Sequence, residues 1–270
     1  MQSSFGRATA VCALALSMAG SAHAQSNDDW QFRASLYGYF PDIGGTTTFP
    51  PTNQSSSATV DIQTILDSLK FTFMGSFEAS KGRWGGFADV VYMDVGNTRQ
   101  GVRDFRLGQV GLPADVSASL GLDLKGWVGT LAGTYRMVAD ESLTADALFG
   151  ARVLDLRLKL NWNLAGNLVP IALPDHAGTR EVDDSNVDAI IGVKGRKTFG
   201  ADHRWFVPYY LDIGTGQSRF TWQAYAGAGY SFDWGDLLAA WRYIDYRMKS
   251  GDAVEELDFN GPAVAVVFRW

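Results

Sequence analysis

The sequence predicts an all-β fold, namely a closed antiparallel transmembrane β-barrel of about ten strands with one short helix in the first outer loop. Three observations support this prediction. Apolar and polar residues alternate with a period of two through most of the chain. The connections between the alternating segments are short and long in turn. No run of 18 apolar residues occurs that could form a spanning helix.

The first 24 residues have the features of a secretory signal peptide. Arg7 precedes an apolar segment over 8–20, and Ala22-His23-Ala24 has the form of a cleavage site. The alternative is a buried N-terminal helix. Cleavage would remove the only cysteine, Cys12, and would change the net charge from −6 to −7, because Arg7 is the only charged residue removed. We expect a signal peptide over 1–24 and one barrel domain over 25–270, exported to a Gram-negative envelope.

The composition argues against several classes of protein. A single cysteine excludes a disulfide scaffold and a zinc site built from cysteines. The acidic balance, with 23 basic and 29 acidic residues, argues against nucleic acid as a partner. Aromatic residues make up 13% of the chain, which argues against intrinsic disorder. We expect no metal and no cofactor.

Ten segments carry the strand pattern. In the first, Phe32, Ala34 and Leu36 share one face while Arg33 and Tyr37 share the other. The segments near 84–95 and 236–248 alternate less cleanly, and there the turns and lengths support the prediction. The expected strands are 30–41, 69–80, 84–95, 122–138, 142–158, 186–198, 205–215, 218–232, 236–248 and 256–270.

The connections divide into two sets. Short turns are expected at 81–83, 139–141, 199–204 and 233–235. Longer loops are expected at 42–68, 96–121 and 159–185, with shorter ones at 214–218 and 249–255. An even number of strands with short turns at one end is the plan of a porin-like outer-membrane barrel. A bilayer forces such a sheet to close, because lipid cannot satisfy the backbone groups of an edge strand.

A soluble sandwich would also alternate, and three features separate it from a membrane barrel. Five tryptophans fall at the expected short-turn end, as in an interfacial girdle: Trp30, Trp84, Trp205, Trp234 and Trp270. The last strand ends on an aromatic residue with apolar residues at spacing two, which resembles the signal for outer-membrane assembly: Val264, Val266, Phe268 and Trp270. Phenylalanine is the usual terminal residue there, so Trp270 is a departure.

The third feature is charge in the middle of strands, on the face opposite the apolar one. A sandwich core would not tolerate it, whereas a barrel lumen would: Arg33, Lys70, Glu78, Asp89, Asp146, Arg152, Asp188, Lys194, Arg196, Asp212 and Arg242. These six basic and five acidic residues predict mutual pairing rather than a ring of one sign. The lumen is expected to be filled by salt bridges and aromatic side chains, and the alternative is a narrow channel.

Several motifs resemble those of an uncharacterised group of proteobacterial outer-membrane β-barrel proteins. They are MGSFEA at 74–79, KGRWG at 81–85, ADVVYMD at 88–94, PYYLDIGTG at 208–216, FDWGD at 232–236 and RYIDY at 242–246. The resemblance covers most of residues 60–270. It implies an outer-membrane barrel and implies no activity, so no functional residue is carried over from it.

Histidine limits the enzymatic possibilities. His203 is expected in a short turn, and His176 lies beside Asp175 in a long loop, where the pair could activate water. Nearby carboxylates could instead bind a divalent ion: Glu181, Asp183 and Asp184. The alternative for both is a solvated acidic loop. The spacing of Ile62, Ile65, Leu66 and Leu69 predicts the short helix, within residues 60–69.

Three functions remain open from the sequence. The first is a non-enzymatic envelope protein with a structural role or with partners for its outer loops. The second is a narrow pore or transporter for small solutes, and the third is a hydrolase at the barrel rim that uses Asp175 and His176. Expected partners are outer-membrane lipid and lipopolysaccharide, with the barrel-assembly machinery during biogenesis. We expect a monomer.

Overall fold

The computed structural model describes residues 29–47, 56–60, 69–101, 106–107, 110–111, 117–165, 177–249 and 254–270. Three predicted features lie outside these residues: the signal peptide, the short helix apart from the ends of the segment 60–69, and the Asp175–His176 pair. In the part of the chain that is described, no helix has the length and hydropathy needed to cross a membrane.

All described regular structure is β-strand, in one sheet. The strands are β1 (Gln31–Tyr39), β2 (Asp42–Thr47), β3 (Ser56–Val60), β4 (Leu69–Lys81), β5 (Trp84–Gly101), β6 (Arg106–Leu107), β7 (Val110–Gly111), β8 (Ser117–Ala139), β9 (Leu143–Ala165), β10 (Ala177–Phe199), β11 (Trp205–Gly216), β12 (Phe220–Ser231), β13 (Gly235–Arg247) and β14 (Val254–Arg269).

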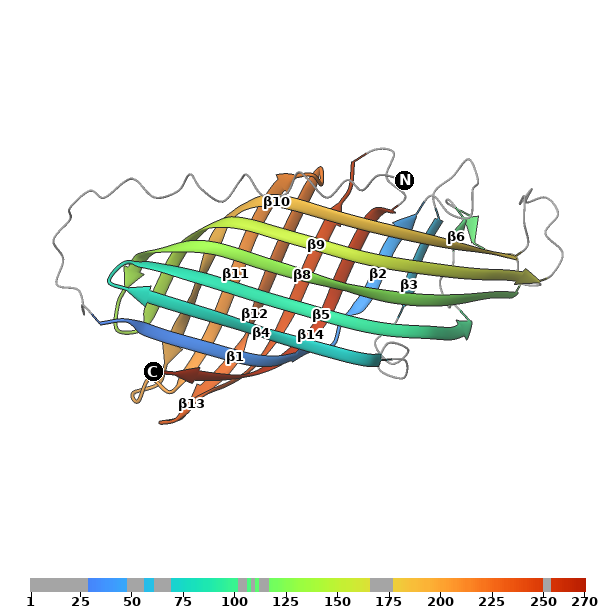
Figure 1. Cartoon of the computed structure of the whole chain (residues 1–270). Helices are drawn as coiled ribbons and strands as arrows, with labels where there is room; N and C mark the ends of the chain where they lie inside the picture. Colours follow the sequence, from blue (N-terminus) through green and yellow to red (C-terminus); the bar gives the residue numbers. More distant parts are fainter. Residues whose placement is uncertain are drawn as a thin grey trace.

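Ten of these strands form a closed ring. Each pairs antiparallel with its neighbours in the order β1-β4-β5-β8-β9-β10-β11-β12-β13-β14, and β14 pairs with β1 to close the cylinder (Figure 1). Arg33 lies opposite Arg269 in this closing pair. The ten-stranded closed barrel predicted from the period of two is therefore confirmed, and all ten expected strands are present.

The expected loop at 42–68 is wrong in part, because it contains β2 and β3. Pro41 interrupts the first strand, since proline has no backbone N–H to donate. The pairing with β14 nevertheless continues in the same register, from Tyr39 opposite Ala263 to Asp42 opposite Asn260. The Phe40 N–H donates to the Pro262 carbonyl at 2.9 Å between them. β1 and β2 thus act as one long strand against β14.

The other edge of this long strand changes partner. β1 pairs with β4 as far as Leu36 opposite Gly75, whereas β2 pairs with β3. β3 in turn pairs with the two-residue strand β6, which pairs with β7. A short branch of the sheet therefore leaves the ring at Pro41.

Four strands extend well beyond their predicted bounds: β5, which ends at Gly101 rather than at 95, and β8, β9 and β10. β8, β9 and β10 each contain 23 residues and extend beyond the rest of the barrel at the end opposite the short turns (Figure 1). Parts of the expected loops at 96–121 and 159–185 are therefore strand. These extensions pair with one another, from Ser117 opposite Ala165 inward, so their backbone groups are satisfied without a bilayer.

The short turns lie where the sequence placed them. Gly82 has a φ of 60°, which a residue without Cβ adopts at no steric cost, and it joins β4 to β5. His203 has a φ of 52° in the turn between β10 and β11. Its Nδ1 lies 3.3 Å from Thr198 Oγ1 at the exposed surface, so His203 is a turn residue, as predicted.

Candidate functional site

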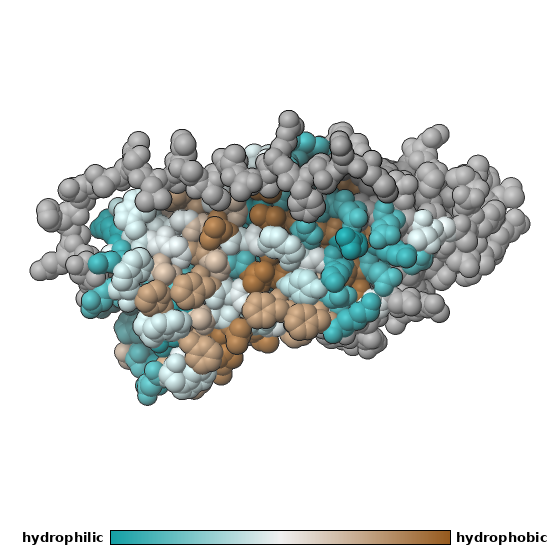
Figure 2. Space-filling model, in the orientation of Figure 1, coloured by the Kyte–Doolittle hydropathy of each residue, from teal (hydrophilic) through white to brown (hydrophobic). Residues whose placement is uncertain are grey.

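The outer wall carries a continuous apolar band. On β9 the outward residues between the two ends of the band are Ala145, Ala147, Phe149, Ala151 and Val153, and Asp155 and Arg157 follow. In Figure 2, apolar side chains gather across the middle of the visible face, with hydrophilic ones toward the ends. Aliphatic and aromatic residues that would be buried in a soluble protein are exposed here, for example Leu131, at 67%, and Ile191, at 63%.

Aromatic rings line the short-turn edge of this band. The five predicted girdle tryptophans are all more than half exposed. Their rings contact neighbouring rings, and Trp205, Tyr230, Phe232, Trp234 and Phe268 follow one another around the rim with centroid distances of 4.8–6.0 Å. Trp30 and Trp270 both stack on Phe32. Amphipathic rings in this position suit the boundary between lipid and water.

Charged side chains mark the other edge of the band. Asp94 on β5 and Lys125 on β8 face outward and form an ion pair of 3.5 Å. Ten positions separate Trp84 from Asp94 on β5, which is about 33 Å along a strand and about 25 Å along the barrel axis at a typical tilt. This matches the apolar height of outer-membrane barrels. The protein is an outer-membrane β-barrel.

Inside the barrel, the half toward the long strands is filled by apolar side chains. We call this cluster the apolar block. It includes residues from opposite walls and from β2: Tyr39, Ile43, Met74, Val91, Met93, Val95, Leu124, Val128, Leu154, Leu156, Ile244, Tyr246, Met248, Val254, Leu257, Phe259 and Ala263. The cavity left within it is about 20 Å³, which is room for about one water.

The boundary between this block and the polar part of the lumen is sharp. On three wall strands a buried charged residue is followed, two positions later on the same inward face, by the first residue of the block. These pairs are Asp89 and Val91 on β5, Arg152 and Leu154 on β9, and Arg242 and Ile244 on β13. The charged layer therefore borders the apolar block directly, on the side of the block toward the short turns.

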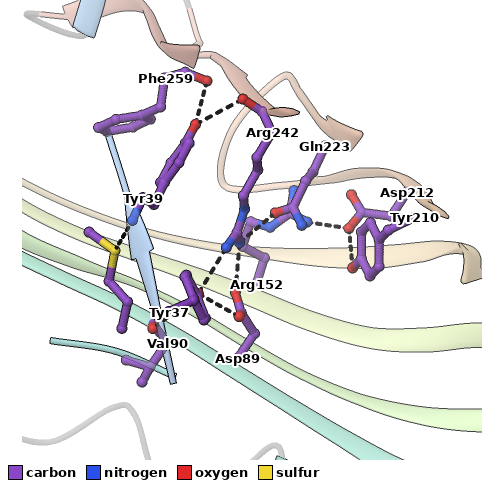
Figure 3. A network of polar contacts seen from close by, with 11 residues as sticks. Tyr37, Tyr39, Asp89, Val90, Arg152, Tyr210, Asp212, Gln223, Arg242 and Phe259 are labelled. Carbon is purple, nitrogen blue, oxygen red and sulfur yellow. Dashed lines mark hydrogen bonds and ion pairs between the residues drawn. The ribbon is translucent and has the colours of Figure 1, made fainter. Parts of the chain in front are cut away.

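Arg242 forms a brace across this charged layer (Figure 3). Its guanidinium donates to Asp89 Oδ2 at 2.6 Å, to the Tyr37 hydroxyl at 2.9 Å and to Gln223 Oε1 at 3.1 Å. Tyr37 itself donates to Asp89 Oδ1 at 2.6 Å. Strands β1, β5, β12 and β13 are thus joined through one guanidinium, and a buried arginine of this kind is stable only with such partners.

Tyr39 connects the brace to the apolar block. Its ring belongs to the block, while its hydroxyl lies 2.9 Å from the Phe259 carbonyl oxygen and 3.2 Å from the Arg242 carbonyl oxygen (Figure 3). The Arg242 guanidinium carbon lies 5.5 Å from the centre of the Tyr39 ring. The aromatic ring thus covers the charged layer from the apolar side.

A second buried ion pair lies in the same layer. Arg152 on β9 pairs with Asp212 on β11, and both side chains are fully buried. Arg152 also donates to Thr221 Oγ1 at 3.3 Å, and the Tyr210 hydroxyl donates to Asp212. These contacts join β9, β11 and β12 on the side of the lumen away from β1.

The half of the lumen toward the short turns contains a cavity of about 140 Å³. Charged side chains line it, and most of them are paired. Lys194 pairs with Glu78, Arg136 with Asp146, and Arg196 with Asp236. Aromatic rings fill the space beside them, with Lys194 over Phe87 and Arg196 over Phe206, each 4.3 Å from the ring centre. This cavity ends at the brace.

Ten of the eleven predicted lumen residues face the interior of the barrel, and Lys70 is the exception. Lys70 lies exposed at the start of β4, at a bulge between Leu69 and Phe71, because the branch of the sheet at Pro41 leaves that end of β4 without β1 as a partner. Asp188 faces inward but differs from the others in its partners. It pairs with no cation among the described residues, and instead accepts from the Ser218 N–H at 2.9 Å and the Ser218 hydroxyl at 2.7 Å.

The lumen also contains charges that the sequence analysis did not select. Arg136, Asp236 and Arg269 all take part in its ion pairs. Each lies near the end of its strand, on the inward face. Each is also two positions from a residue that clearly points inward, for example Val267 in the case of Arg269. Continuing the period of two to the strand ends would have found them.

The acidic loop expected around 181–184 is strand in the structure. Glu181, Asp183 and Asp184 lie in β10, and Asp183 accepts from Arg157 Nε at 2.6 Å. Among the described residues, no group of three or more metal-ligating side chains comes together. The divalent-ion alternative therefore has no support in the described part of this segment.

Comparison with known proteins gives structural likeness alone. No family model matches the chain, and no curated protein matches its sequence. Among solved structures, the outer-membrane protease OmpT from Escherichia coli matches with a TM-score of 0.49 and 8% identity, over 92% of this chain and 98% of that one. The attachment invasion locus protein Ail of Yersinia pestis has a TM-score of 0.33 and 9% identity, with 89% and 98% covered. The toluene transporter TodX of Pseudomonas putida has a TM-score of 0.30 and 10% identity, with 89% of each covered.

Proposed function

We propose that this protein is a non-enzymatic outer-membrane barrel with a closed lumen, which serves a structural role or binds partners through its outer strands and loops. We further propose that it belongs to the uncharacterised proteobacterial barrel group that its motifs resemble. The observation that carries the proposal is the apolar block, packed directly on the charged layer of Arg152 and Arg242. An ion crossing there would lose its hydration and, among the side chains that define the block, would meet no polar group except the hydroxyls of Tyr39 and Tyr246.

Conductance in planar bilayers tests the closed lumen. We expect no stable single-channel steps from the wild-type barrel. Truncating the block in a Leu154→Ala, Ile244→Ala, Phe259→Ala variant should produce small steps, because the constriction loses its side chains. The matched control removes three outward side chains, in Leu131→Ala, Phe149→Ala, Val264→Ala, and should stay silent. Stable steps from the wild-type protein would instead favour the narrow pore.

The partners belong to the same proposal. The outward faces of Val264, Val266, Phe268 and Trp270 support recognition of β14 by the barrel-assembly machinery, and the apolar band supports lipid and lipopolysaccharide as the surrounding partners of a monomer. Deleting Phe268, Arg269 and Trp270 should lower the fraction of heat-modifiable protein in outer membranes, whereas Trp127→Ala should not. Equal assembly of both variants would contradict the role of β14.

A further inference from the structure

The lumen near the short turns contains three guanidinium groups that are poorly matched by acidic partners. Arg33 and Arg269 lie directly opposite each other in the β1–β14 pairing. Both are inward-facing, and both act electrostatically on Arg196 of β10. Like charges placed opposite each other across a sheet are destabilising unless something compensates them. The compensation that the described residues provide is small.

Asp236 is the carboxylate that two of these guanidinium groups share. It lies 3.3 Å from Arg196 and 3.2 Å from Arg269, both longer than the 2.7–2.9 Å that is usual for a charge-assisted hydrogen bond. Its Oδ1, the atom that contacts Arg269, is buried and accepts no hydrogen bond of good geometry among the described residues. One carboxylate therefore serves two guanidinium groups with weak geometry.

Arg33 has still less compensation. Glu78 lies opposite it on β4, but the Glu78 carboxylate is in contact with Lys194. Among the described residues, no hydrogen bond or ion pair involves the Arg33 guanidinium. An arginine carries five N–H donors in a fixed fork, so its donors remain available to a ligand.

These donors lie at a space of suitable size. Arg33 and Arg196 line the cavity of about 140 Å³, together with Asp236 and Lys194. The cavity is next to the short-turn rim, where Phe32 precedes Arg33 and Trp270 follows Arg269 in the chain. Its inner end borders the brace at Arg242.

We propose that this cavity binds a phosphate group, held by Arg33 and Arg196, which line it, with Arg269 beside them on the lining residue Asp236. The planar fork of a guanidinium matches two phosphate oxygens at once, which makes phosphate a better fit than a spherical halide. The phosphate can belong to a free anion of the periplasm or to the headgroup of a phospholipid in the inner leaflet. Both present the same oxygens, and the cavity has room for the group itself.

The test uses the full mature barrel, folded in a phosphate-free, zwitterionic-headgroup-free detergent. Binding of inorganic phosphate is measured by calorimetry at constant ionic strength, with chloride as the reference anion. A second arm titrates short-chain phosphatidic acid below its critical micelle concentration. We expect saturable binding of at least one of these two probes, and the arm that responds identifies the source of the phosphate.

Variants decide whether the cavity is responsible. Arg33→Gln should weaken binding by at least about tenfold, because hydrogen bonds to charged groups are among the strongest that a protein makes. The matched control is Arg204→Gln, which removes an exposed arginine that pairs with Asp233 at 3.1 Å, in a neighbouring turn outside the cavity. It should bind as the wild type does. Heat-modifiable migration checks that both variants fold.

Two results would overturn the proposal. One is the absence of saturable binding of either probe to the folded wild type. The other is binding to Arg33→Gln that equals binding to the wild type, since the site would then lie elsewhere. A loss of conductance or a gain of it bears on the closed lumen alone, so the two proposals fail independently.

Discussion

The two halves of the lumen differ in how they are filled. Toward the short turns, charged side chains pair across a cavity of about 140 Å³. Toward the long strands, apolar side chains from β5, β8 and β9 pack on those of β13, β14 and β2 and leave about 20 Å³. Seven ring strands contribute side chains to both halves: β1, β4, β5, β8, β9, β13 and β14. The difference teaches that the lumen of a membrane barrel can be filled by an ordinary hydrophobic core as well as by salt bridges.

The half of the lumen toward the long strands resembles the core of a β-sandwich more than a pore. β1 and β2 form one long strand along β14, and β2 contributes Ile43 to the apolar block. Apolar burial there is driven by exclusion of water, as in a soluble domain, although the outside of the same strands faces lipid. In the polar half most of the charges are paired instead, although Arg33 has no ion pair among the described residues.

The largest effect should come from the buried pair in the charged layer. Arg152→Met should lower the free energy of unfolding by about 3–5 kcal/mol, because Asp212 would stay buried without a cation. Urea unfolding of the barrel in detergent, followed by tryptophan fluorescence, measures the change. The double variant Arg152→Met, Asp212→Leu should recover most of it. If Arg152→Met were as stable as the wild type, the Arg152–Asp212 pair would not stabilise the barrel.

A smaller effect is expected in the apolar block. Leu154 is almost fully buried, and Leu154→Ala should cost about 2–4 kcal/mol by removing packed methyl groups and leaving a cavity. The control is Val153→Ala, the next residue, which faces outward and should cost less. The same urea titration compares them. Equal costs for the two substitutions would mean that the outer half of the lumen is not packed as a core.

The smallest effect is expected outside both halves. Arg157 and Asp183 form an ion pair of 2.6 Å on exposed strand extensions, with side chains 63% and 66% exposed. Solvent and salt screen such a pair, so Arg157→Ala should leave the urea midpoint unchanged within error. A shift comparable with that of Leu154→Ala would show that the extensions are coupled to the barrel core.

The sequence predicted the ring of strands because alternation is local. Phe149 and Ala151 point outward while Leu148 and Arg152 point inward, and a period of two is sufficient to assign them. The same reasoning placed the girdle at Trp84 and Trp205. It failed at Lys70, since the position of the branch in the sheet depends on which distant strands pair.

The apolar block left a trace in the sequence that the pattern analysis could not interpret. Segment 84–95 alternates poorly because its part beside the block is apolar on both faces, as at Val90 and Val91. Segment 236–248 is apolar on both faces at Leu237 and Leu238, in the other half of the barrel. One face meets lipid and the other meets the opposite wall. Alternation cannot distinguish this from a weak strand, because knowledge of the opposite wall requires the closed barrel. The pairing of Arg242 with Asp89, 153 positions away, is equally nonlocal.

The closing seam of the cylinder has a consequence for biogenesis. Its ladder joins β1 and β2, which come first among the described strands, to β14, which comes last, and runs through Pro41 without a shift in register. If the chain is delivered N-terminus first, the edge of β1 and β2 that pairs with β14 must therefore stay unpaired until β14 is available. Contacts of such wide sequence separation form late, so folding should stay sensitive to anything that pairs with that edge first.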